Sequence, residues 1–311
     1  MSSNTKNIVT HNGGFHADEV FAYVMLKKIY PDNKLIRSRD MEEIEKADIA
    51  IDVGKIYNPS KNRFDHHQEN CSENYTKGID IPMSSAGMVY KTYGRKFLEM
   101  SIGRQVGDNF LFEFYKNIIM EVDAIDNGVK QEQGNKFFIN TGVTRMVNRF
   151  NSDDSTNHEK QYKAFMKAVE YVEMIVSIII EDLNESDKLI QEETLKINKL
   201  LDERKDNNYI VIDFDCKNWY TCIKNYEYKN KKKNIIDWIV YQSGSTENEQ
   251  NANNEWKIKT VGARAKKLKD EQYLKTNMKN PDDFIFVHKA LFVASSKTFE
   301  SAIDIVNLSN K

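Results

Sequence analysis

The sequence predicts an α/β fold, with a parallel sheet in the N-terminal part followed by a smaller α+β domain. Three observations support this prediction. Short apolar runs alternate with segments of helical spacing over residues 8–94, a charged stretch of helical pattern covers 161–206, and β-rich segments return after residue 208. Strand–helix alternation is typical of parallel sheets, which bind ligands at the carboxyl ends of their strands.

The first elements follow in order along the chain. The predicted strands are short apolar runs at residues 8–11, 35–38 and 48–54. The predicted helices between them cover 18–29 and 41–47, where apolar residues recur at helical spacing. The third strand is apolar enough to be buried on both faces, as expected in a parallel sheet.

Further helices are predicted in the middle of the chain. One covers 84–94, because it begins at serines suited to N-capping and ends at Gly94. Another covers 105–127, where apolar residues again recur at helical spacing. A polar loop at 150–160 precedes the long helical stretch, in which a break is predicted near 184–186.

The last third of the chain is β-rich. Strand-forming segments are predicted at 209–215, 234–242, 256–263 and 284–295, followed by a helix at 298–309. These segments lack the regular alternation with helices seen earlier in the chain. They therefore predict a second, smaller unit of mixed α+β structure.

The composition excludes several classes of protein. The 311 residues are 40% hydrophobic and 30% charged with a net charge of -2, which is typical of a soluble globular chain rather than a strongly basic nucleic-acid binder. No apolar run is long enough to span a membrane, and the N-terminus shows no targeting pattern. We expect a cytoplasmic or nucleocytoplasmic protein. Three scattered cysteines (Cys71, Cys216 and Cys222) argue against a disulfide framework or a zinc–thiolate site.

Four of the six histidines fall in two short clusters. The first cluster contains His11, His16 and Asp18, at the predicted transition from the first strand to the first helix. Two glycines between the histidines allow a tight backbone path. Two imidazoles and a carboxylate can therefore converge at one sheet edge, beside a helix N-terminus that favours anions.

The second cluster is the run Asp65, His66 and His67. Between the two clusters, Asp52 ends the third predicted strand, which places a carboxylate at the same edge of the sheet. An acidic group at 121–128 closes a predicted helix at a turn. The pattern brings imidazole and carboxylate groups from four separate segments to one place.

Imidazole and carboxylate ligands suit Mn²⁺, Fe²⁺, Zn²⁺ or Co²⁺. Two ions about 3.5–4 Å apart need a bridging carboxylate and roughly three protein ligands each, and such a pair clamps a phosphoryl group. The residues that meet this demand are His11, His16, Asp18, Asp52, His66 and one of Asp123 or Asp126. The two acids of the last pair are equal candidates.

Each feature also has a simpler explanation. A single histidine at a strand end is more often an ordinary polar residue than a ligand, Asp52 could cap its strand, and the run at 126–128 resembles a common turn. The coincidence of two histidine–aspartate clusters with strand-end acids favours the metal site. Arg145 and Arg149 lie four residues apart, so on a helix they could bind phosphate together or form a solvated, salt-bridged face.

The order of these motifs resembles the DHH phosphoesterase superfamily, and most closely its eukaryotic MYG1 family of metal-dependent hydrolases. The segments that carry the resemblance are 11–13, 15–19, 37–40, 52–54, 64–68, 84–87 and 121–128. Residues 284–288 look like the C-terminal motif of the family. The resemblance therefore spans nearly the whole chain.

The resemblance implies a DHH-type metal-binding catalytic domain at 1–155, a helical connector at 156–207 and an α+β substrate-binding domain at 208–311. It implies two divalent metal ions, with Mn²⁺ expected and Mg²⁺, Co²⁺ or Zn²⁺ as alternatives. It also implies 3′→5′ exonuclease activity on RNA. The catalytic motif would be Asp65, His66 and His67, with Asp65 and His67 supporting the ligands or contacting phosphate.

Two departures from the superfamily pattern matter. The usual Asp-X-Asp of the first motif is replaced by residues 16–18, a change that MYG1-like sequences share. Near the C-terminus, relatives tend to carry Gly-Gly-His where this chain has Val293, Ala294, Ser295 and Ser296. A substrate contact at that position is therefore in question. His288 stays a candidate for substrate binding, against the alternative of an ordinary strand histidine.

Three functions fit these features. The leading hypothesis is a metal-dependent phosphodiesterase, a 3′→5′ RNA exonuclease. The second is a phosphatase of the same superfamily that acts on a short oligonucleotide, a cyclic dinucleotide or pyrophosphate. The third is a non-catalytic, metal-stabilised RNA-binding protein. The physiological substrate, the native metal and a homodimeric state are left open by the sequence.

Overall fold

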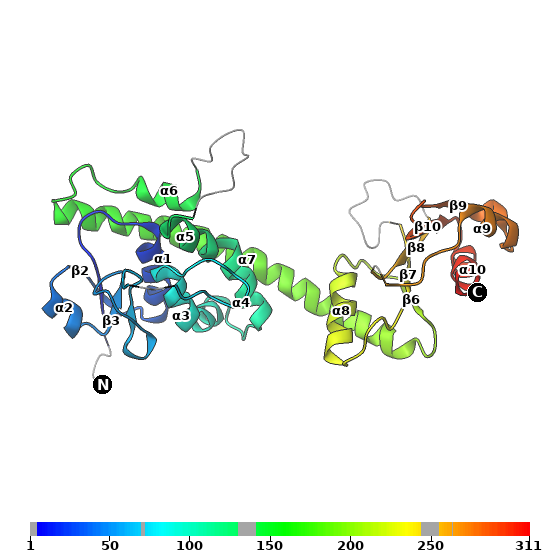
Figure 1. The fold of residues 1–311 in the computed structure, drawn as a ribbon, viewed down its shortest axis with the longest axis horizontal. Helices are drawn as coiled ribbons and strands as arrows, with labels where there is room; N and C mark the ends of the chain where they lie inside the picture. Colours follow the sequence, from blue (N-terminus) through cyan, green and yellow to red (C-terminus); the bar gives the residue numbers. More distant parts are fainter. Residues whose placement is uncertain (1–4, 70–71, 130–140, 244–254, 263) are drawn as a thin grey trace. The chain divides into compact units, whose positions relative to one another are not determined.

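The computed structural model describes residues 5–69, 72–129, 141–243, 255–262 and 264–311. Cys71 lies outside these residues. The chain forms two compact units, residues 1–185 and 186–311, and each has its own five-stranded sheet (Figure 1). None of the described helices is both long and apolar enough to cross a membrane.

The first sheet is mainly parallel. Its strands are β1 (Asn7–Thr10), β2 (Lys34–Arg37), β3 (Ile49–Ile51), β4 (Tyr57–Asn58) and β5 (Arg63–Phe64). They lie in the order β2-β1-β3-β5-β4, and all pairs are parallel except β4 with β5. The predicted α/β fold with a parallel N-terminal sheet is confirmed.

Helices cover both faces of this sheet. In chain order they are α1 (Ala17–Ile29), α2 (Met41–Lys46), the 3-10 turn η1 (Pro59–Lys61), α3 (Ser85–Ile102), α4 (Asp108–Phe114), the π-helical turn η2 (Tyr115–Ile119), α5 (Met120–Asp126) and α6 (Val143–Asn148). Successive strand residues point to opposite faces. Ile8 therefore belongs to the core formed with α1 and α3, whereas Val9 packs with Ile44 of α2.

The predicted end of a helix at Gly94 is wrong, because α3 continues to Ile102. Gly94 is buried beside the ring of Tyr90, and a Cβ at this position would lie 2.6 Å from that ring. The glycine therefore allows close packing within the helix and does not terminate it.

The helix α7 (His158–Glu203) is continuous, so the predicted break near 184–186 is also wrong. The side chain of Asn184 accepts hydrogen bonds from Arg104 Nε and Nη2 at 3.0 and 2.8 Å. It is thereby kept from competing with the helical backbone, the usual reason that asparagine weakens helices. The division between the two units falls within α7. The assignment of catalysis to one unit and substrate binding to the other stays a prediction.

The second sheet has the order β6-β7-β8-β10-β9, with β6 and β7 parallel and the other pairs antiparallel. Its strands are β6 (Tyr209–Ile212), β7 (Trp238–Gln242), β8 (Trp256–Thr260), β9 (Phe284–Val287) and β10 (Val293–Ser296). The segment predicted at 284–295 thus forms two strands with a turn between them.

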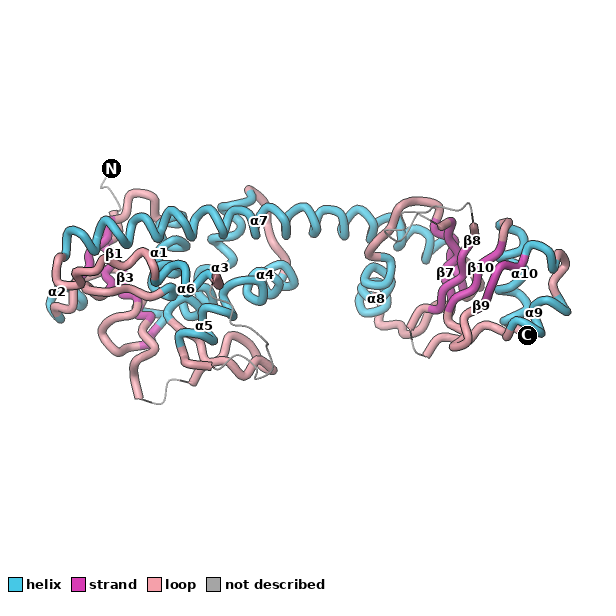
Figure 2. The backbone as a smooth tube through the Cα atoms, turned by 90° about the horizontal axis from the view of Figure 1, so that it is seen from above, coloured by secondary structure: helices cyan, strands magenta, loops and turns pink. Residues whose placement is uncertain are grey.

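Helices lie on both sides of the second sheet (Figure 2). The helix α8 (Trp219–Lys229) and the last turns of α7 share a core with one face. The helices α9 (Glu271–Asn277) and α10 (Phe299–Asn310) share a core with the other, and a 3-10 turn, η3 (Pro281–Asp283), precedes β9. The predicted α+β character is confirmed, although α8 and α9 were not predicted.

Candidate active site

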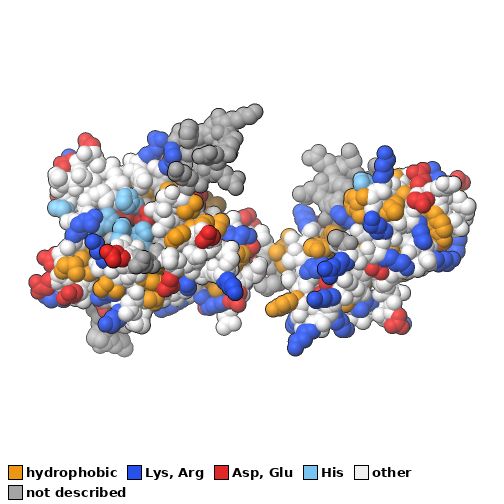
Figure 3. All heavy atoms as spheres, viewed as in Figure 1, with side chains coloured by type: hydrophobic (Ala, Val, Ile, Leu, Met, Phe, Trp, Pro, Cys, Tyr) orange, Lys and Arg blue, Asp and Glu red, His pale blue; other side chains and the backbone are white. Residues whose placement is uncertain are grey.

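The candidate site lies at the carboxyl ends of three neighbouring parallel strands. His11 follows β1, Asp52 follows β3 and Asp65 follows β5, and these strands are adjacent in the sheet. Ligand sites in open α/β sheets lie at this edge. Figure 3 shows histidine side chains gathered around acidic ones on one face of this unit.

The loop between β1 and α1 brings two histidines and two acids together. His11 is buried, and its Nε2 lies 2.9 Å from Glu19 Oε1 and 3.2 Å from Asp52 Oδ2. His16 is the N-cap of α1 and is exposed, whereas Asp18 in the first turn is buried. The predicted convergence of the first motif with Asp52 is therefore present in the structure.

Glu19 belongs to the first motif, but the sequence reasoning did not name it as a candidate ligand. Besides contacting His11, its Oε2 accepts a hydrogen bond from the backbone N–H of His16 at 2.9 Å. The missed signal was the capping box, in which an acid three residues after the N-cap bonds back to the N-cap backbone. Glu19 thus links the two histidines of the first motif.

Asp52 lies at the centre of the cluster. Its backbone has a φ of 53°, the left-handed region that non-glycine residues seldom adopt. Its carboxylate oxygens lie 3.6 Å from His66 Nε2 and 3.3 Å from His67 Nδ1, and Ser85 Oγ donates to Oδ1 at 3.3 Å. The turn after β3 therefore directs one carboxylate toward both histidine motifs.

The Asp65–His67 run divides into groups with different surroundings. Asp65 is buried, and its oxygens accept hydrogen bonds from the backbone N–H groups of Lys55 and His67 at 2.6 and 2.9 Å. It also lies 2.9 Å from His67 Nδ1, so it orients that ring. The His67 side chain is 56% exposed, whereas that of His66 is 10% exposed. His66 therefore faces the interior of the cluster, whereas His67 lies at its solvent-exposed edge, the mouth of the cluster.

The structure separates Asp126 from Asp123. Asp126 Oδ2 lies 3.0 Å from His66 Nε2. Asp123 instead accepts hydrogen bonds from Ser84 N, Ser84 Oγ and Gly87 N on one oxygen and from Tyr115 OH on the other, at 2.7–3.1 Å. Asp123 therefore ties α5 to the start of α3, and the geometry favours Asp126 as the ligand.

Burial and charge perturb the pKa values of the cluster. Burial lowers the pKa of His11, but hydrogen bonds to Asp52 and Glu19 outweigh it and raise the value to about 10. Burial, followed by the charges of Asp52 and Asp126, raises the pKa of Asp18 well above its usual range. Such strong perturbation is characteristic of functional sites.

The residues fit a divalent metal. Both carboxylate oxygens of Asp18 are buried and have no hydrogen-bond partner within the described part of the chain. Buried carboxylates are normally paired or bound to a metal. Three groups have ligand atoms within 4.8 Å of one another: His11, His16, Glu19 and Asp52; Asp52, His66 and His67; and His16, Asp18 and Asp126. Asp52 and His16 each belong to two groups, so the groups overlap.

Comparison with known proteins assigns the family. The model of the MYG1 exonuclease family, described as "Uncharacterised protein family (UPF0160)", matches residues 7–309. The chain belongs to the MYG1 family. This result confirms the predicted family.

The relatives differ in how much of the chain they match. The MYG1 protein of Dictyostelium discoideum is 27% identical over 95% of this chain and 94% of its own length. A MYG1 protein of Saccharomyces cerevisiae is 26% identical over 99% of this chain and 96% of its own length. The MYG1 exonuclease of Mus musculus is 35% identical, but the match covers 53% of this chain and 47% of that protein. The chain thus matches about half the length of the mouse relative.

A crystal structure of RecJ from Thermus thermophilus in complex with Mn²⁺ aligns with 98% of this chain and 52% of its own chain, at 12% identity. The TM-score is 0.29, which supports no conclusion about the MYG1-family chain. The metal identity, RNA as substrate and the cellular location stay predictions.

The predicted substrate-binding residues of this MYG1-family chain lie outside the cluster. Arg145 on α6 and Arg149 just after it are both exposed. His288 lies in the second unit, in the turn after β9, where its ring contacts that of Phe292 at 4.4 Å between centroids. The roles of these three residues in substrate binding stay predictions.

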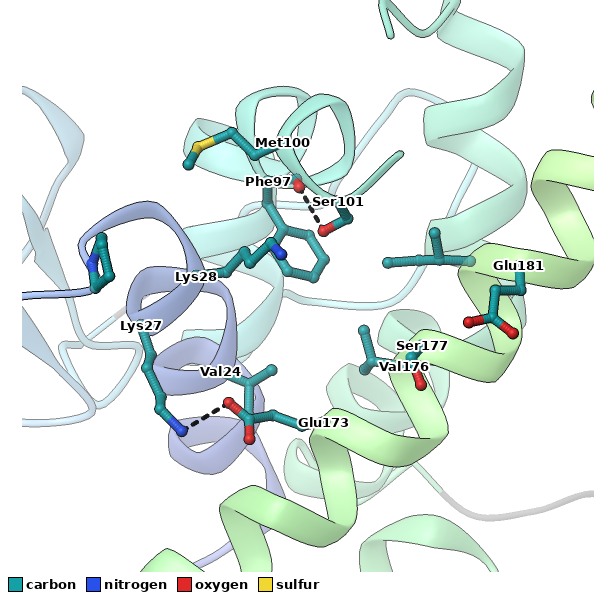
Figure 4. Close-up of a pocket in the computed structure, with 12 residues that line it drawn as sticks. Val24, Lys27, Lys28, Phe97, Met100, Ser101, Glu173, Val176, Ser177 and Glu181 are labelled. Carbon is teal, nitrogen blue, oxygen red and sulfur yellow. Dashed lines mark hydrogen bonds and ion pairs between the residues drawn. The ribbon is translucent and has the colours of Figure 1, made fainter. Parts of the chain in front are cut away.

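The MYG1-family chain also has a cavity of about 630 Å³ (Figure 4). It is lined by parts of α1, α3 and α7, with Val24, Phe97, Val176 and the ion pair between Lys27 and Glu173. None of the clustered histidines or acids lines it. The candidate chemistry therefore belongs to the sheet edge and not to this cavity.

Proposed function

We propose that this MYG1-family chain is a 3′→5′ RNA exonuclease that uses two divalent metal ions, with Mn²⁺ as the expected metal. The observation that carries the proposal is the overlap of the three ligand groups through Asp52 and His16. Two ions about 3.5–4 Å apart need shared ligands of this kind. A single structural ion would not need so many converging groups.

The residues divide into two roles in this proposal. The ions would be held by His11, His16, Asp18, Asp52, His66 and Asp126, and Glu19 is a further candidate. When bound, such a pair activates water and stabilises charge on a phosphoryl group. His67, whose ring Asp65 orients and whose side chain is 56% exposed, would contact a phosphate oxygen of the substrate.

The charge distribution supports a nucleic-acid substrate bound by the second unit. Residues 186–311 carry 22 Lys and Arg against 19 Asp and Glu, whereas residues 1–185 carry 23 against 28. The second unit also exposes aromatic rings, with Tyr228 89% and Phe292 40% exposed. Basic groups combined with exposed rings suit single-stranded nucleic acid, whose bases stack on aromatic side chains.

A second candidate is a phosphatase for short substrates. The excess of acidic residues in the first unit would repel a long polyanion close to the cluster. A dinucleotide, a cyclic dinucleotide or pyrophosphate would meet less of this repulsion. Turnover on an RNA dinucleotide and on a long single-stranded RNA therefore separates the two candidates.

The test uses purified full-length chain with Mn²⁺ and RNA labelled at either end. A 3′→5′ exonuclease releases labelled mononucleotide at once from 3′-labelled RNA and gives a ladder from 5′-labelled RNA. Asp52→Asn should abolish both the release of mononucleotide and the ladder of products. Asp32→Asn makes the same change at an exposed residue and should leave both activities intact. Cleavage of the dinucleotide alone would favour the phosphatase, and no cleavage of either substrate would overturn both proposals.

A further inference from the structure

The loop between β1 and α1 carries two candidate ligands on a glycine-rich backbone. Residues 11–16 include Gly13, with a φ of +86°, and Gly14. Glycine loses more backbone entropy on ordering than any other residue. A metal site of fixed geometry therefore requires other groups to hold this loop in place.

One such group is Asn151, which lies 136 positions further along the chain than Phe15. Its Oδ1 accepts the backbone N–H of Phe15 at 2.8 Å, and its Nδ2 donates to the backbone carbonyl of Phe15, also at 2.8 Å. The same Nδ2 donates to the carbonyl of Asn148 at 3.2 Å. A single side chain thus satisfies both backbone groups of the residue before His16 and ties them to the end of α6.

Arg37, at the end of β2, holds the same loop from another side. Its Nη2 donates to the carbonyl of Gly13 at 3.0 Å. Its guanidinium group lies over the rings of Phe165, on α7, and Phe15, at 4.8 and 5.4 Å from their centroids. The Phe15 side chain is only 1% exposed, so it anchors the loop in the core.

We infer that Asn151 is a positioning residue for the metal site, assisted by Arg37. This inference rests on the proposed function, because it assumes that His11 and His16 bind metal. Asn151 fixes the backbone of Phe15, the residue before His16. Arg37 fixes the backbone carbonyl of Gly13, two residues after His11. Groups that orient ligands without touching the metal typically contribute about 10–100-fold to metal affinity.

The test is Asn151→Asp, which keeps the shape of the side chain but replaces its donor by an oxygen. That oxygen faces the carbonyl oxygens of Phe15 and Asn148, so two hydrogen bonds are replaced by electrostatic repulsion. The matched control is Asn148→Asp, because Asn148 is exposed and acts on this network through its backbone carbonyl. Both variants change the charge equally and lie three residues apart.

The readout is Mn²⁺ affinity, measured by calorimetry, together with the melting temperature of the metal-free protein. We expect Asn151→Asp to bind Mn²⁺ about 10–100-fold more weakly, with activity recovering at high Mn²⁺, and Asn148→Asp to match the wild type. A lower melting temperature with unchanged Mn²⁺ affinity would show a purely structural role and overturn the inference.

Arg37→Lys provides an independent variant in case Asn151→Asp does not fold. It keeps the positive charge, removes the planar donor group that reaches Gly13, and leaves α6 untouched. Unchanged Mn²⁺ affinity in Arg37→Lys would also count against the inference. If the wild type binds no Mn²⁺, the proposed function fails. If the wild type and the variants bind equally, the positioning role alone fails.

Discussion

The carboxylate of Asp126 lies 3.0 Å from His66 Nε2, which joins the end of α5 to the turn after β5. Three residues earlier on the same helix, Asp123 faces the start of α3 and accepts four hydrogen bonds there. One helix thus carries two acids with separate tasks. Asp126 contributes to the candidate metal site, whereas Asp123 fixes α5, the helix that carries Asp126, against the start of α3.

This separation predicts opposite effects for two matched substitutions. Asp126→Asn should weaken Mn²⁺ binding and activity strongly, and it should destabilise the metal-free protein less than Asp123→Asn, because Asp126 contacts His66 whereas Asp123 accepts four hydrogen bonds. Asp123→Asn should lower the free energy of unfolding by about 1–2 kcal/mol, because the amide can no longer accept a hydrogen bond from Tyr115 OH while its oxygen keeps the three donors at the start of α3. Urea unfolding in a chelator and Mn²⁺ titration measure the two effects. Equal loss of metal affinity in both variants would contradict the assignment.

The contact between Asp123 and Gly87 predicts a packing effect. A Cβ on Gly87 would lie 2.7 Å from Asp123 Cγ, so Gly87→Ala forces α3 and α5 apart. We expect it to lower the free energy of unfolding by about 1–3 kcal/mol. Gly107→Ala is the control, since a Cβ at Gly107 meets no atom within 4 Å. Urea unfolding of both variants gives the comparison, and equal stabilities would show that the helices are not in close contact here.

The buried carboxylate of Asp18 predicts a substitution with opposite effects in the two metal states. Burial and nearby charges raise the pKa of Asp18, so ionising this carboxyl costs free energy. Asp18→Asn removes that cost, and the metal-free protein should gain about 1 kcal/mol of stability at a pH where the carboxyl is ionised. Metal binding should be lost in the same variant. The wild type should gain about 2.7 kcal/mol when Mn²⁺ is present at 100 times its Kd.

Thermal unfolding with chelator and with Mn²⁺ tests both parts of this prediction. The exposed variant Asp32→Asn should behave as the wild type in both conditions. If Mn²⁺ stabilises Asp18→Asn as much as the wild type, Asp18 is not a ligand. If metal-free Asp18→Asn is less stable than the metal-free wild type, the Asp18 carboxylate stabilises the folded chain even without metal.

The different exposure of the paired histidines predicts different defects. His66→Asn should lose metal, because His66 faces Asp52 and Asp126 within the cluster. His67→Asn should keep the metal but turn over substrate about 10²–10³-fold more slowly, the usual range for the loss of one donor to developing negative charge. Metal analysis of the purified variants, followed by single-turnover kinetics, separates the two. Loss of metal in His67→Asn would place His67 among the ligands.

Much of the fold and the site could be predicted from the sequence. Apolar runs and helical spacing located β1, β2 and β3, because local burial patterns reflect the faces of a sheet. The residues that follow these strands had to converge, because parallel strands present their carboxyl ends at one edge. His11 and Asp52 follow two of these predicted strands and lie 3.2 Å apart, between Nε2 and Oδ2. Asp65 follows β5, a strand that the sequence did not predict.

Two local signals in the sequence predicted helix interruptions that the structure does not contain. Gly94 resembles a helix end, but it lies inside α3, where it makes room for the ring of Tyr90 one turn earlier. Asn184 reads as a break, but its bonds to Arg104 remove the competition with the backbone. At Asn184 the local signal was outweighed by a tertiary contact, 80 residues away in the sequence.

The sequence by itself determined the family, the α/β class and the set of residues from which a metal site could be built. Only the tertiary structure decided which of these residues meet. It placed Asp126 beside His66, gave Asp123 a structural task, added Glu19, and brought Asn151 to the loop before His16. The physical reason is that ligand types follow from chemistry, whereas distances between segments remote in sequence follow from how helices and strands pack.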